Sequence, residues 1–246
     1  MRKTIFLFAL LAGTLSLQAQ NYPLRARLSD PNSFSVIVIP DPQSYTKFAA
    51  NQPLFELQTA WIAREIDSLR ILTALCTGDL VEQNENIVLN RKMLNQTSRE
   101  MWEAASHALA RLDGKVPYIV SPGNHDYGYR KAENSRTCFP DYFPFERNPA
   151  WRDVCVATYP NRNGAISLEN AAFAFDDPAW GGLLVVTTEF LPRDEVLDWA
   201  AALIDKPEYR DRKVIFMTHA FLHERSAKRI EKNSYELTPG NTGAEI

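Results

Sequence analysis

Short, nearly continuous apolar runs mark the first half of the chain. Residues 34–41 (FSVIVIPD), 71–79 (ILTALCTGD) and 116–120 (VPYIV) have the length of strands, and the first two end at a turn signal and an aspartate. Such runs are typical of strands that are buried on both faces. Apolar residues recur at helical spacing in the two segments between these runs, 53–70 and 86–112. The alternation of strand and helix predicts a parallel sheet with right-handed crossovers.

The second half of the chain has a different pattern. Residues 165–170 (AISLEN) and 172–177 (AFAFDD) are short alternating runs, and 183–190 (LLVVTTEF) follows them, which predicts neighbouring antiparallel strands. A helix with a proline and acidic residues at its start is expected over 192–204, and another buried strand over 213–219 (KVIFMTH). The whole pattern predicts one α/β domain in which two sheets pack together.

The composition is that of an ordinary globular domain. The chain has 246 residues, of which 45% are hydrophobic and 23% charged, and this is enough for one sizeable core. The formal net charge is −3, and no dense run of lysine and arginine occurs, so the footprint of a nucleic-acid-binding protein is absent.

The first twenty residues have the plan of a secretory signal. Arg2 and Lys3 give a positive start, a short apolar stretch follows, and Ala19 is a small residue suited to cleavage. A membrane anchor is the alternative, but the stretch falls short of the roughly 20 apolar residues that a spanning helix needs. We expect cleavage near Ala19 and Gln20, no membrane span in the mature chain, and a secreted or periplasmic protein.

The cysteines fit an exported protein unevenly. Cys76 lies in an apolar run and is expected to be a small buried residue. Cys138 and Cys155 bracket a stretch rich in proline and aromatic residues. A bridge between them would contribute roughly 3 kcal/mol on the chain-entropy argument, and export permits disulfides. We therefore expect Cys138 and Cys155 to be paired and Cys76 to be free.

Polar side chains stand at the ends of four predicted buried strands. They are Asp41, Asp79, the neighbours Asn124 and His125, and His219. Each has an ordinary explanation alone, since aspartate caps helices, asparagine forms turns, and a single histidine is more often a core residue than a ligand. Strand ends of an α/β sheet are nevertheless where functional side chains collect. Carboxylate, amide and imidazole donors together predict a site for Mn, Fe, Zn or Mg.

Four motifs in a fixed order resemble those of the calcineurin-like metallophosphoesterase superfamily. They are PDPQ (40–43), GDLVE (78–82), GNHD (123–126) and MTH (217–219), and GNHD after a buried strand is the most specific of them. The resemblance covers about residues 34–246, and the Asp-x-Gln form of the first motif is similar to the secreted bacterial branch. It implies an α/β fold of the αββα type, a two-sheet sandwich flanked by helices. It also implies hydrolysis of phosphate esters, either monoesters or diesters.

The resemblance implies a centre of two divalent metal ions (Mn, Fe, Zn or Mg). Asp41 would bind the first metal together with Gln43, which stands where the superfamily usually has histidine. Asp79 would bridge both metals, and Asn124 and His219 would bind the second. Two cations lower the pKa of a shared water and neutralise the phosphoryl oxygens, so that hydroxide can attack phosphorus.

The resemblance also implies which residues act on the leaving group. His125 would be the general acid, a role that suits histidine near neutral pH, and the Glu82 carboxylate would orient it. His107 is expected to be structural, and His223 stays ambiguous between a phosphate contact and a loop residue. Basic and aromatic residues crowd the segment 127–162, which either meets the substrate or is merely solvated.

One motif of the superfamily, G-H-x-H, does not occur before the sequence reaches NTGAEI (241–246). The resemblance therefore implies that the domain, residues 21–246, is cut short before this motif and lacks its last strands. A metal-binding domain that is catalytically weak or inactive is the alternative function. A purely structural role for the strand-end residues is the third. The kind of phosphate ester stays open.

Overall fold

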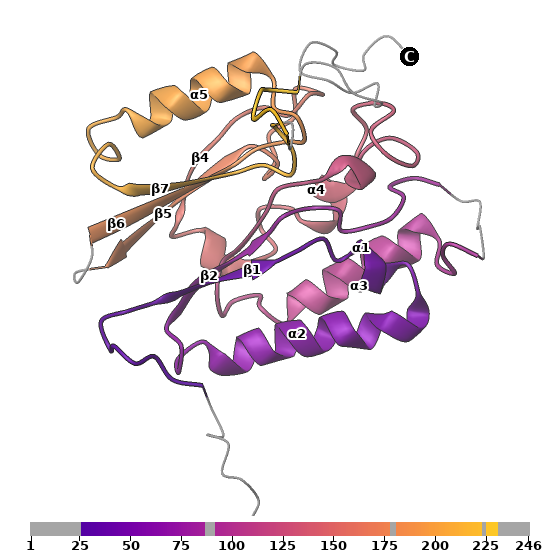
Figure 1. The fold of residues 1–246 in the computed structure, drawn as a ribbon, viewed down its shortest axis with the longest axis horizontal. Coiled ribbons are helices and arrows are strands. Elements are labelled where there is room, and N and C mark those ends of the chain that lie inside the picture. Colours follow the sequence, from indigo (N-terminus) through magenta and orange to yellow (C-terminus); the bar gives the residue numbers. More distant parts are fainter. Residues whose placement is uncertain (1–25, 87–91, 178–180, 223–224, 231–246) are drawn as a thin grey trace, which may run out of the picture.

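The computed structural model describes residues 26–86, 92–177, 181–222 and 225–230 (Figure 1). Its elements follow the chain in this order: β1 (Ser35–Ile39), α1 (Gln43–Thr46), η1 (Ala49–Asn51), α2 (Gln52–Glu65), β2 (Ile71–Cys76), α3 (Ser98–Ala110), β3 (Tyr118–Val120), η2 (Asn124–Asp126), α4 (Phe139–Tyr142), η3 (Pro149–Trp151), β4 (Cys155–Thr158), β5 (Ala171–Asp177), β6 (Gly181–Thr187), α5 (Asp194–Ile204) and β7 (Lys213–Met217).

Three parallel strands in the order β1–β2–β3 form the first sheet, as the apolar runs predict. Ile39 of β1 lies beside Cys76 of β2, and Cys76 lies beside Val120 of β3. The three strands therefore end at the same level. The turns that follow them meet at one edge of the sheet, and the predicted ligand residues lie in these turns.

The second sheet has four strands in the order β4–β5–β6–β7. β5 runs antiparallel to both β4 and β6, whereas β6 and β7 are parallel. Thr187 at the end of β6 pairs with Met217 at the end of β7, and His219 follows two residues later. The second sheet thus brings a single predicted ligand to the region where the first sheet ends.

The predicted strand over 165–170 is wrong, and β4 takes its place beside β5. Asn161 holds the start of this segment in a turn, because its side-chain oxygen accepts hydrogen bonds from the backbone N–H groups of Asn163 (3.0 Å) and Ala165 (2.9 Å). Local bonds of this kind compete with a strand ladder. The alternation of apolar and polar residues was therefore outweighed by turn chemistry.

The predicted helix over 86–112 is confirmed only in its second part, because α3 begins at Ser98. Residues 87–91 lie outside the described part of the chain. The start is set by a capping box in which the Thr97 hydroxyl accepts from the Glu100 N–H (3.2 Å) and the Glu100 carboxylate accepts from the Thr97 N–H (2.7 Å). A capping box satisfies the first N–H groups of a helix and fixes its first residue.

The predicted helix over 53–70 is confirmed as α2, which ends at Glu65. The chain then turns back into β2, and the N–H of Ile71 donates to the carbonyl of Ile66 (2.9 Å). Arg70 has a φ of 44°, in the left-handed region, and a right-handed helix does not continue through such a residue.

Helices cover the outer faces of both sheets (Figure 1), with α2 and α3 on the first sheet and α5 on the second. Side chains alternate along β6, as expected for a strand covered on both faces. Leu183 and Val185 belong to the core that both sheets share, whereas Leu184 and Val186 pack against α5. The layers are thus helix, sheet, sheet, helix, and the predicted α/β class with two sheets is confirmed.

All three cysteines are unpaired, so the expected bridge between Cys138 and Cys155 is wrong. The two thiols point at different parts of the backbone. Cys138 Sγ lies 3.9 Å from the Asn84 carbonyl oxygen, and Cys155 Sγ lies 3.9 Å from that of Ala157. Cys76 is buried within β2, as predicted.

Two sequence expectations fall on residues that the structure does not describe. They are the secretory signal, residues 1–20, and the role of His223. Of the helices in the described part of the chain, none combines the length and the apolar character that crossing a membrane requires.

Candidate metal centre

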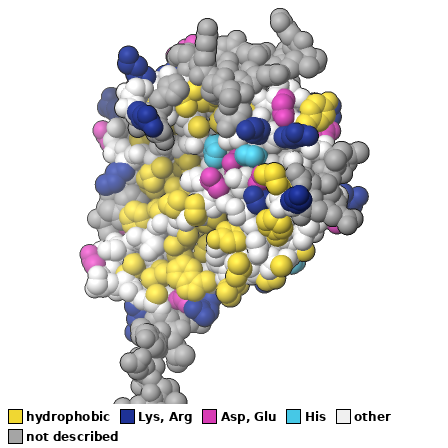
Figure 2. Space-filling model, turned by 45° about the vertical axis from the view of Figure 1, so that its right-hand side comes forward, with side chains coloured by type: hydrophobic (Ala, Val, Ile, Leu, Met, Phe, Trp, Pro, Cys, Tyr) yellow, Lys and Arg dark blue, Asp and Glu magenta, His cyan; other side chains and the backbone are white. Residues whose placement is uncertain are grey.

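Side chains from three strand ends converge on one face of the molecule. Asp41 follows β1, Asp79 follows β2 and His219 follows β7, and one ligand atom of each lies within 4.8 Å of the others. The Asp79 side chain is only 5% exposed, whereas that of Asp41 is 46% exposed. Figure 2 shows histidine and acidic side chains together at an open surface, with lysine and arginine side chains beside them. Carboxylates and an imidazole in this arrangement could hold a divalent cation that stays accessible from solvent.

His219 is oriented through its Nδ1 atom, which lies 2.8 Å from the carbonyl oxygen of Thr77. Because a carbonyl oxygen only accepts, Nδ1 carries the hydrogen and the neutral ring presents a lone pair on Nε2. Nε2 lies 3.2 Å from Asn124 Oδ1 and 3.6 Å from Asp79 Oδ2. Three electron-pair donors thus face one another. Such a cluster is stabilised by a cation among the three atoms or by a proton on Nε2.

Two glycines allow the turns after β2 and β3 to touch. Gly78 has a φ of 108°, and a Cβ at this position would clash with the Ser121 carbonyl oxygen. Gly123 has an ordinary φ, but a Cβ there would lie 2.6 Å from the backbone nitrogen of Asp79. Asp79 itself has a φ of 49°, which is strained for a residue other than glycine. Close backbone approach therefore accounts for glycine at both positions.

Asp126, the last residue of the GNHD motif, joins the same two turns. Its side chain is fully buried and accepts hydrogen bonds from the N–H groups of Gly123 (2.8 Å) and Val81 (3.2 Å). Burial, followed by the negative charge of Asp79, raises the pKa of the Asp126 carboxyl group well above its usual value. Burial also raises the pKa of Asp79, against the opposing effect of the nearby histidines. A bound cation would favour the ionised form of both carboxyl groups.

Gln43 lies at the start of α1, against the turn that carries Asp79. Its backbone N–H donates to the Asp79 carbonyl oxygen (2.9 Å). Its side-chain Oε1 is buried, and no residue in the described part of the chain donates a hydrogen bond to it. A buried acceptor without a partner costs about 1–3 kcal/mol. An amide oxygen held in this way has the chemistry of a cation ligand.

His125 is held by its backbone and by its ring. Its N–H donates to Asp79 Oδ1 (2.9 Å), and its Nδ1 lies 2.7 Å from the backbone carbonyl oxygen of Glu82. The Glu82 carboxylate, which was expected to orient the ring, instead accepts from Lys47 Nζ (2.8 Å). Glu82 thus orients His125 through its main chain. The contact leaves Nε2 without a partner among the described residues.

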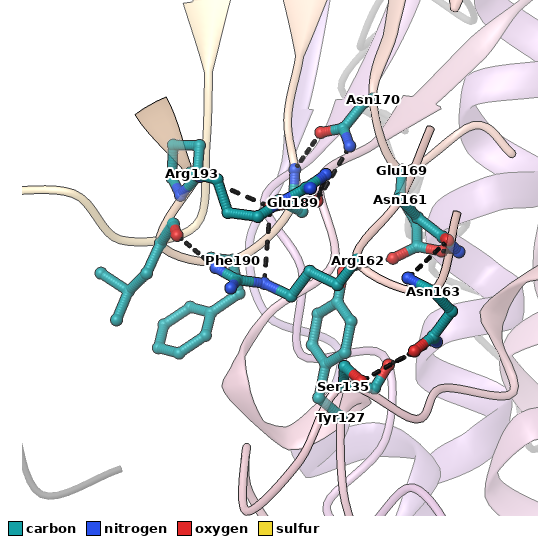
Figure 3. Close-up of polar contacts among 12 residues, drawn as sticks. Tyr127, Ser135, Asn161, Arg162, Asn163, Glu169, Asn170, Glu189, Phe190 and Arg193 are labelled. Atoms are coloured by element: carbon teal, nitrogen blue, oxygen red, sulfur yellow. Dashed lines mark hydrogen bonds and ion pairs between the residues drawn. The ribbon is translucent and has the colours of Figure 1, made fainter. Parts of the chain in front are cut away.

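Figure 3 shows a buried network of charges around Glu189. The Glu189 side chain is fully buried and pairs with Arg193 Nε (2.9 Å) and Arg162 Nε (3.4 Å). Arg162 also donates to the Phe190 carbonyl oxygen (3.3 Å). The Phe190 ring packs against the His219 imidazole, with ring centres 6.0 Å apart. The network therefore supports Phe190, against which the His219 ring packs.

The structure brings four of the five predicted metal ligands into direct proximity and places the fifth, Gln43, at the start of α1 against the turn that carries Asp79. The four are Asp41, Asp79, Asn124 and His219. His107 lies exposed on α3 and contacts Glu56 (3.1 Å), so it is a surface residue.

Sequence reasoning missed two residues that hold the centre together. Asp126 was visible in the GNHD motif but received no role. Thr77 donates its hydroxyl hydrogen to Asp41 Oδ1 (2.9 Å), while its carbonyl accepts from His219. In the sequence, Thr77 is marked only by its position directly before Gly78 and Asp79. Its two partners, Asp41 and His219, follow β1 and β7 and are distant from it in the sequence.

Comparison with known proteins adds one distant relative. No protein-family model matches the chain. Over a comparison of 180 residues that covers 71% of the chain, it is 28% identical to the uncharacterized protein YvnB of Bacillus subtilis (strain 168). The chain spans only 12% of the length of that protein. The similarity places a related segment within a much longer bacterial protein.

Proposed function

We propose that the protein is a metal-dependent hydrolase of phosphate esters, of the calcineurin-like metallophosphoesterase type. The observation that carries the proposal is the convergence of His219 Nε2, Asn124 Oδ1 and Asp79 Oδ2, with Asp41 beside them. A proton on Nε2 would also satisfy this cluster, which makes metal binding the first quantity to test. The layer order of helix, sheet, sheet, helix supports the same proposal.

The side chains divide between two cation positions in the proposal. Asp41 and Gln43 would hold one cation, Asn124 and His219 the other, and Asp79 would contact both. The buried, unpartnered oxygen of Gln43 fits this role, because it is an acceptor with no other use among the described residues. When bound, divalent cations such as Mn, Fe, Zn or Mg polarise a phosphoryl group and lower the pKa of a water.

His125 would protonate the leaving oxygen. Its Nδ1 hydrogen is engaged by the Glu82 carbonyl, so in the protonated ring the hydrogen on Nε2 is the one available for transfer. The bond from its N–H to Asp79 Oδ1 fixes the distance between this proton donor and the ligand cluster. A general acid in such a position contributes about 10²- to 10⁴-fold to the rate.

The test combines metal binding with turnover in one preparation. The purified chain is stripped with chelator and titrated with Mn²⁺, and hydrolysis of 4-nitrophenyl phosphate and bis(4-nitrophenyl) phosphate is followed. We expect bound metal and metal-dependent hydrolysis of at least one ester. Asp79→Asn should abolish both, whereas Asp198→Asn, an exposed carboxylate on α5, should change neither.

Two other outcomes have clear meanings. Stoichiometric metal binding without hydrolysis of either ester would support the alternative, a metal-binding domain that is catalytically weak or inactive. Absence of metal binding at millimolar Mn²⁺ would reject the proposal.

A further inference from the structure

A surface pocket opens at the far end of the two loops that hold His125. It has a volume of about 460 Å³ and is lined by Glu85, Asn86, Tyr129 and Arg130. The N–H of Glu85 donates to the Tyr129 carbonyl oxygen (3.3 Å), so the loops lie side by side here, as they do where His125 meets Glu82. Tyr129 and Arg130 follow the proposed proton donor His125 by four and five residues, and Glu85 and Asn86 follow its partner Glu82 by three and four residues.

The loop that carries Tyr129 and Arg130 is held rigidly. The Glu133 carboxylate accepts hydrogen bonds from three consecutive N–H groups, those of Tyr129, Arg130 and Lys131, each at 3.0 Å. Gly128 has a φ of 70°, and a Cβ there would lie 2.7 Å from the Glu133 nitrogen. Although burial raises the pKa of Glu133, backbone N–H hydrogen bonds lower it overall, which favours the ionised carboxylate that accepts them.

The loop presents two exposed side chains, those of Tyr129 and Arg130. Tyr129 is 54% exposed, and Arg130 is exposed. No hydrogen bond or ion pair links the Arg130 guanidinium to any residue that the structure describes. The acid in the pocket, Glu85, is already paired with Arg136 (2.8 Å), so the charge of Arg130 is not compensated by it.

We propose that Tyr129 and Arg130 form a binding subsite for the leaving group of the substrate. Tyr129 offers a ring for stacking, and Arg130 offers a fork of donors that matches a second anionic group. The leaving group that fits is a planar heteroaromatic ring with its own negative charge, the chemistry of a nucleotide unit. This inference rests on the proposed function, because it places the reacting phosphoryl group at the metal centre.

The experiment measures binding and turnover separately. Adenosine 5′-monophosphate is the probe for the leaving group, and its dissociation constant is measured by calorimetry with the metal-free protein, which does not hydrolyse it. Turnover is compared for adenosine 5′-diphosphate, whose leaving group carries a charge, and for 4-nitrophenyl phosphate, whose leaving group fits no second anion. The variants are Arg130→Gln and Tyr129→Leu, with Arg152→Gln as an exposed control next to η3.

We expect Arg130→Gln to weaken binding of the monophosphate about tenfold and to lower kcat/KM for the diphosphate by a similar factor, without affecting 4-nitrophenyl phosphate. Tyr129→Leu should weaken binding about threefold or more. Arg152→Gln should leave all values unchanged. Equal effects of Arg130→Gln and Arg152→Gln would overturn the subsite while leaving the phosphoesterase proposal intact. If no ester is hydrolysed, the proposed function fails, and the binding data alone still decide the subsite.

Discussion

The two sheets support the candidate metal centre in different ways. The first sheet supplies Asp41, Asp79 and Asn124 from tight turns, where glycine permits contacts between neighbouring backbones. The second sheet supplies His219 alone and supports it from behind with a buried network around Glu189. One side is shaped by local sterics and the other by charges brought together from distant segments. Variants on the two sides should therefore fail in different ways.

The largest effect is expected at Asp79, which contacts both turns and His219. Asp79→Asn keeps the shape of the side chain but removes its charge, and metal affinity should fall by more than about 100-fold, with loss of hydrolysis. Asp41→Asn, at an exposed position, should cause a smaller loss. Isothermal titration with Mn²⁺ measures both affinities, and equal, small losses would argue against a shared role for Asp79.

A large effect on rate alone is expected at His125. His125→Ala should slow hydrolysis about 10²- to 10⁴-fold and leave the metal content unchanged, because the ring is a proton donor and not a ligand in this account. The defect should be smaller for nitrophenyl esters, whose leaving group needs little protonation, than for alkyl phosphates. A defect that is the same for both kinds of ester, or the loss of bound metal, would give His125 another role.

Substitutions in the network of the second sheet should mainly lower the free energy of unfolding. Glu189→Gln leaves the guanidinium of Arg162 buried beside a neutral group, and the free energy of unfolding should fall by about 3–5 kcal/mol. The control is Glu103→Gln, which removes an exposed i,i+4 pair with Arg99 and should leave the free energy of unfolding nearly unchanged. Urea unfolding gives both values. Equal losses for the two variants would show that the Glu189 network carries little of the stability.

A smaller effect on stability, coupled to metal binding, is expected at Gly123. Gly123→Ala forces a Cβ against the Asp79 backbone, which should destabilise the fold by about 1–3 kcal/mol and weaken Mn²⁺ binding. Gly164→Ala should cost about 1 kcal/mol through its positive φ alone, because nothing lies within 4 Å of its Cβ, and should leave metal binding intact. Unchanged metal affinity in Gly123→Ala would mean that the turn tolerates displacement of Asp79.

The difference between the two sides also explains what the sequence could reveal. Motifs such as GD and GNHD are local, so the turns of the first sheet, and the ligands that they carry, could be proposed before the structure was known. The pairing of Arg162 with Glu189 and the two contacts of Thr77 join segments that are distant in the sequence, and no local pattern encodes such contacts. The misplaced strand over 165–170 has a similar origin, since the side chain of Asn161 determined the turn.

Two wrong predictions about side-chain contacts have the same origin. The sequence predicts that the Glu82 carboxylate contacts His125, but the backbone carbonyl of Glu82 makes this contact. The carboxylate instead pairs with Lys47, which directly follows α1. The pairing of Cys138 with Cys155 was inferred from spacing along the chain, which says nothing about the direction of the two thiols.

In the proposed metal centre, the lone pair of His219 Nε2 faces a metal cation and not a proton. Nitrogen-15 NMR of the histidine side chains, with and without Zn²⁺, tests this directly, and His219→Gln assigns the signal. We expect Zn²⁺ to move the Nε2 resonance to the shift of a metal-bound nitrogen, while the Nδ1–H group still donates its hydrogen bond to the Thr77 carbonyl oxygen. A protonated Nε2 that is unchanged by saturating Zn²⁺ would show that His219 holds a proton and binds no metal.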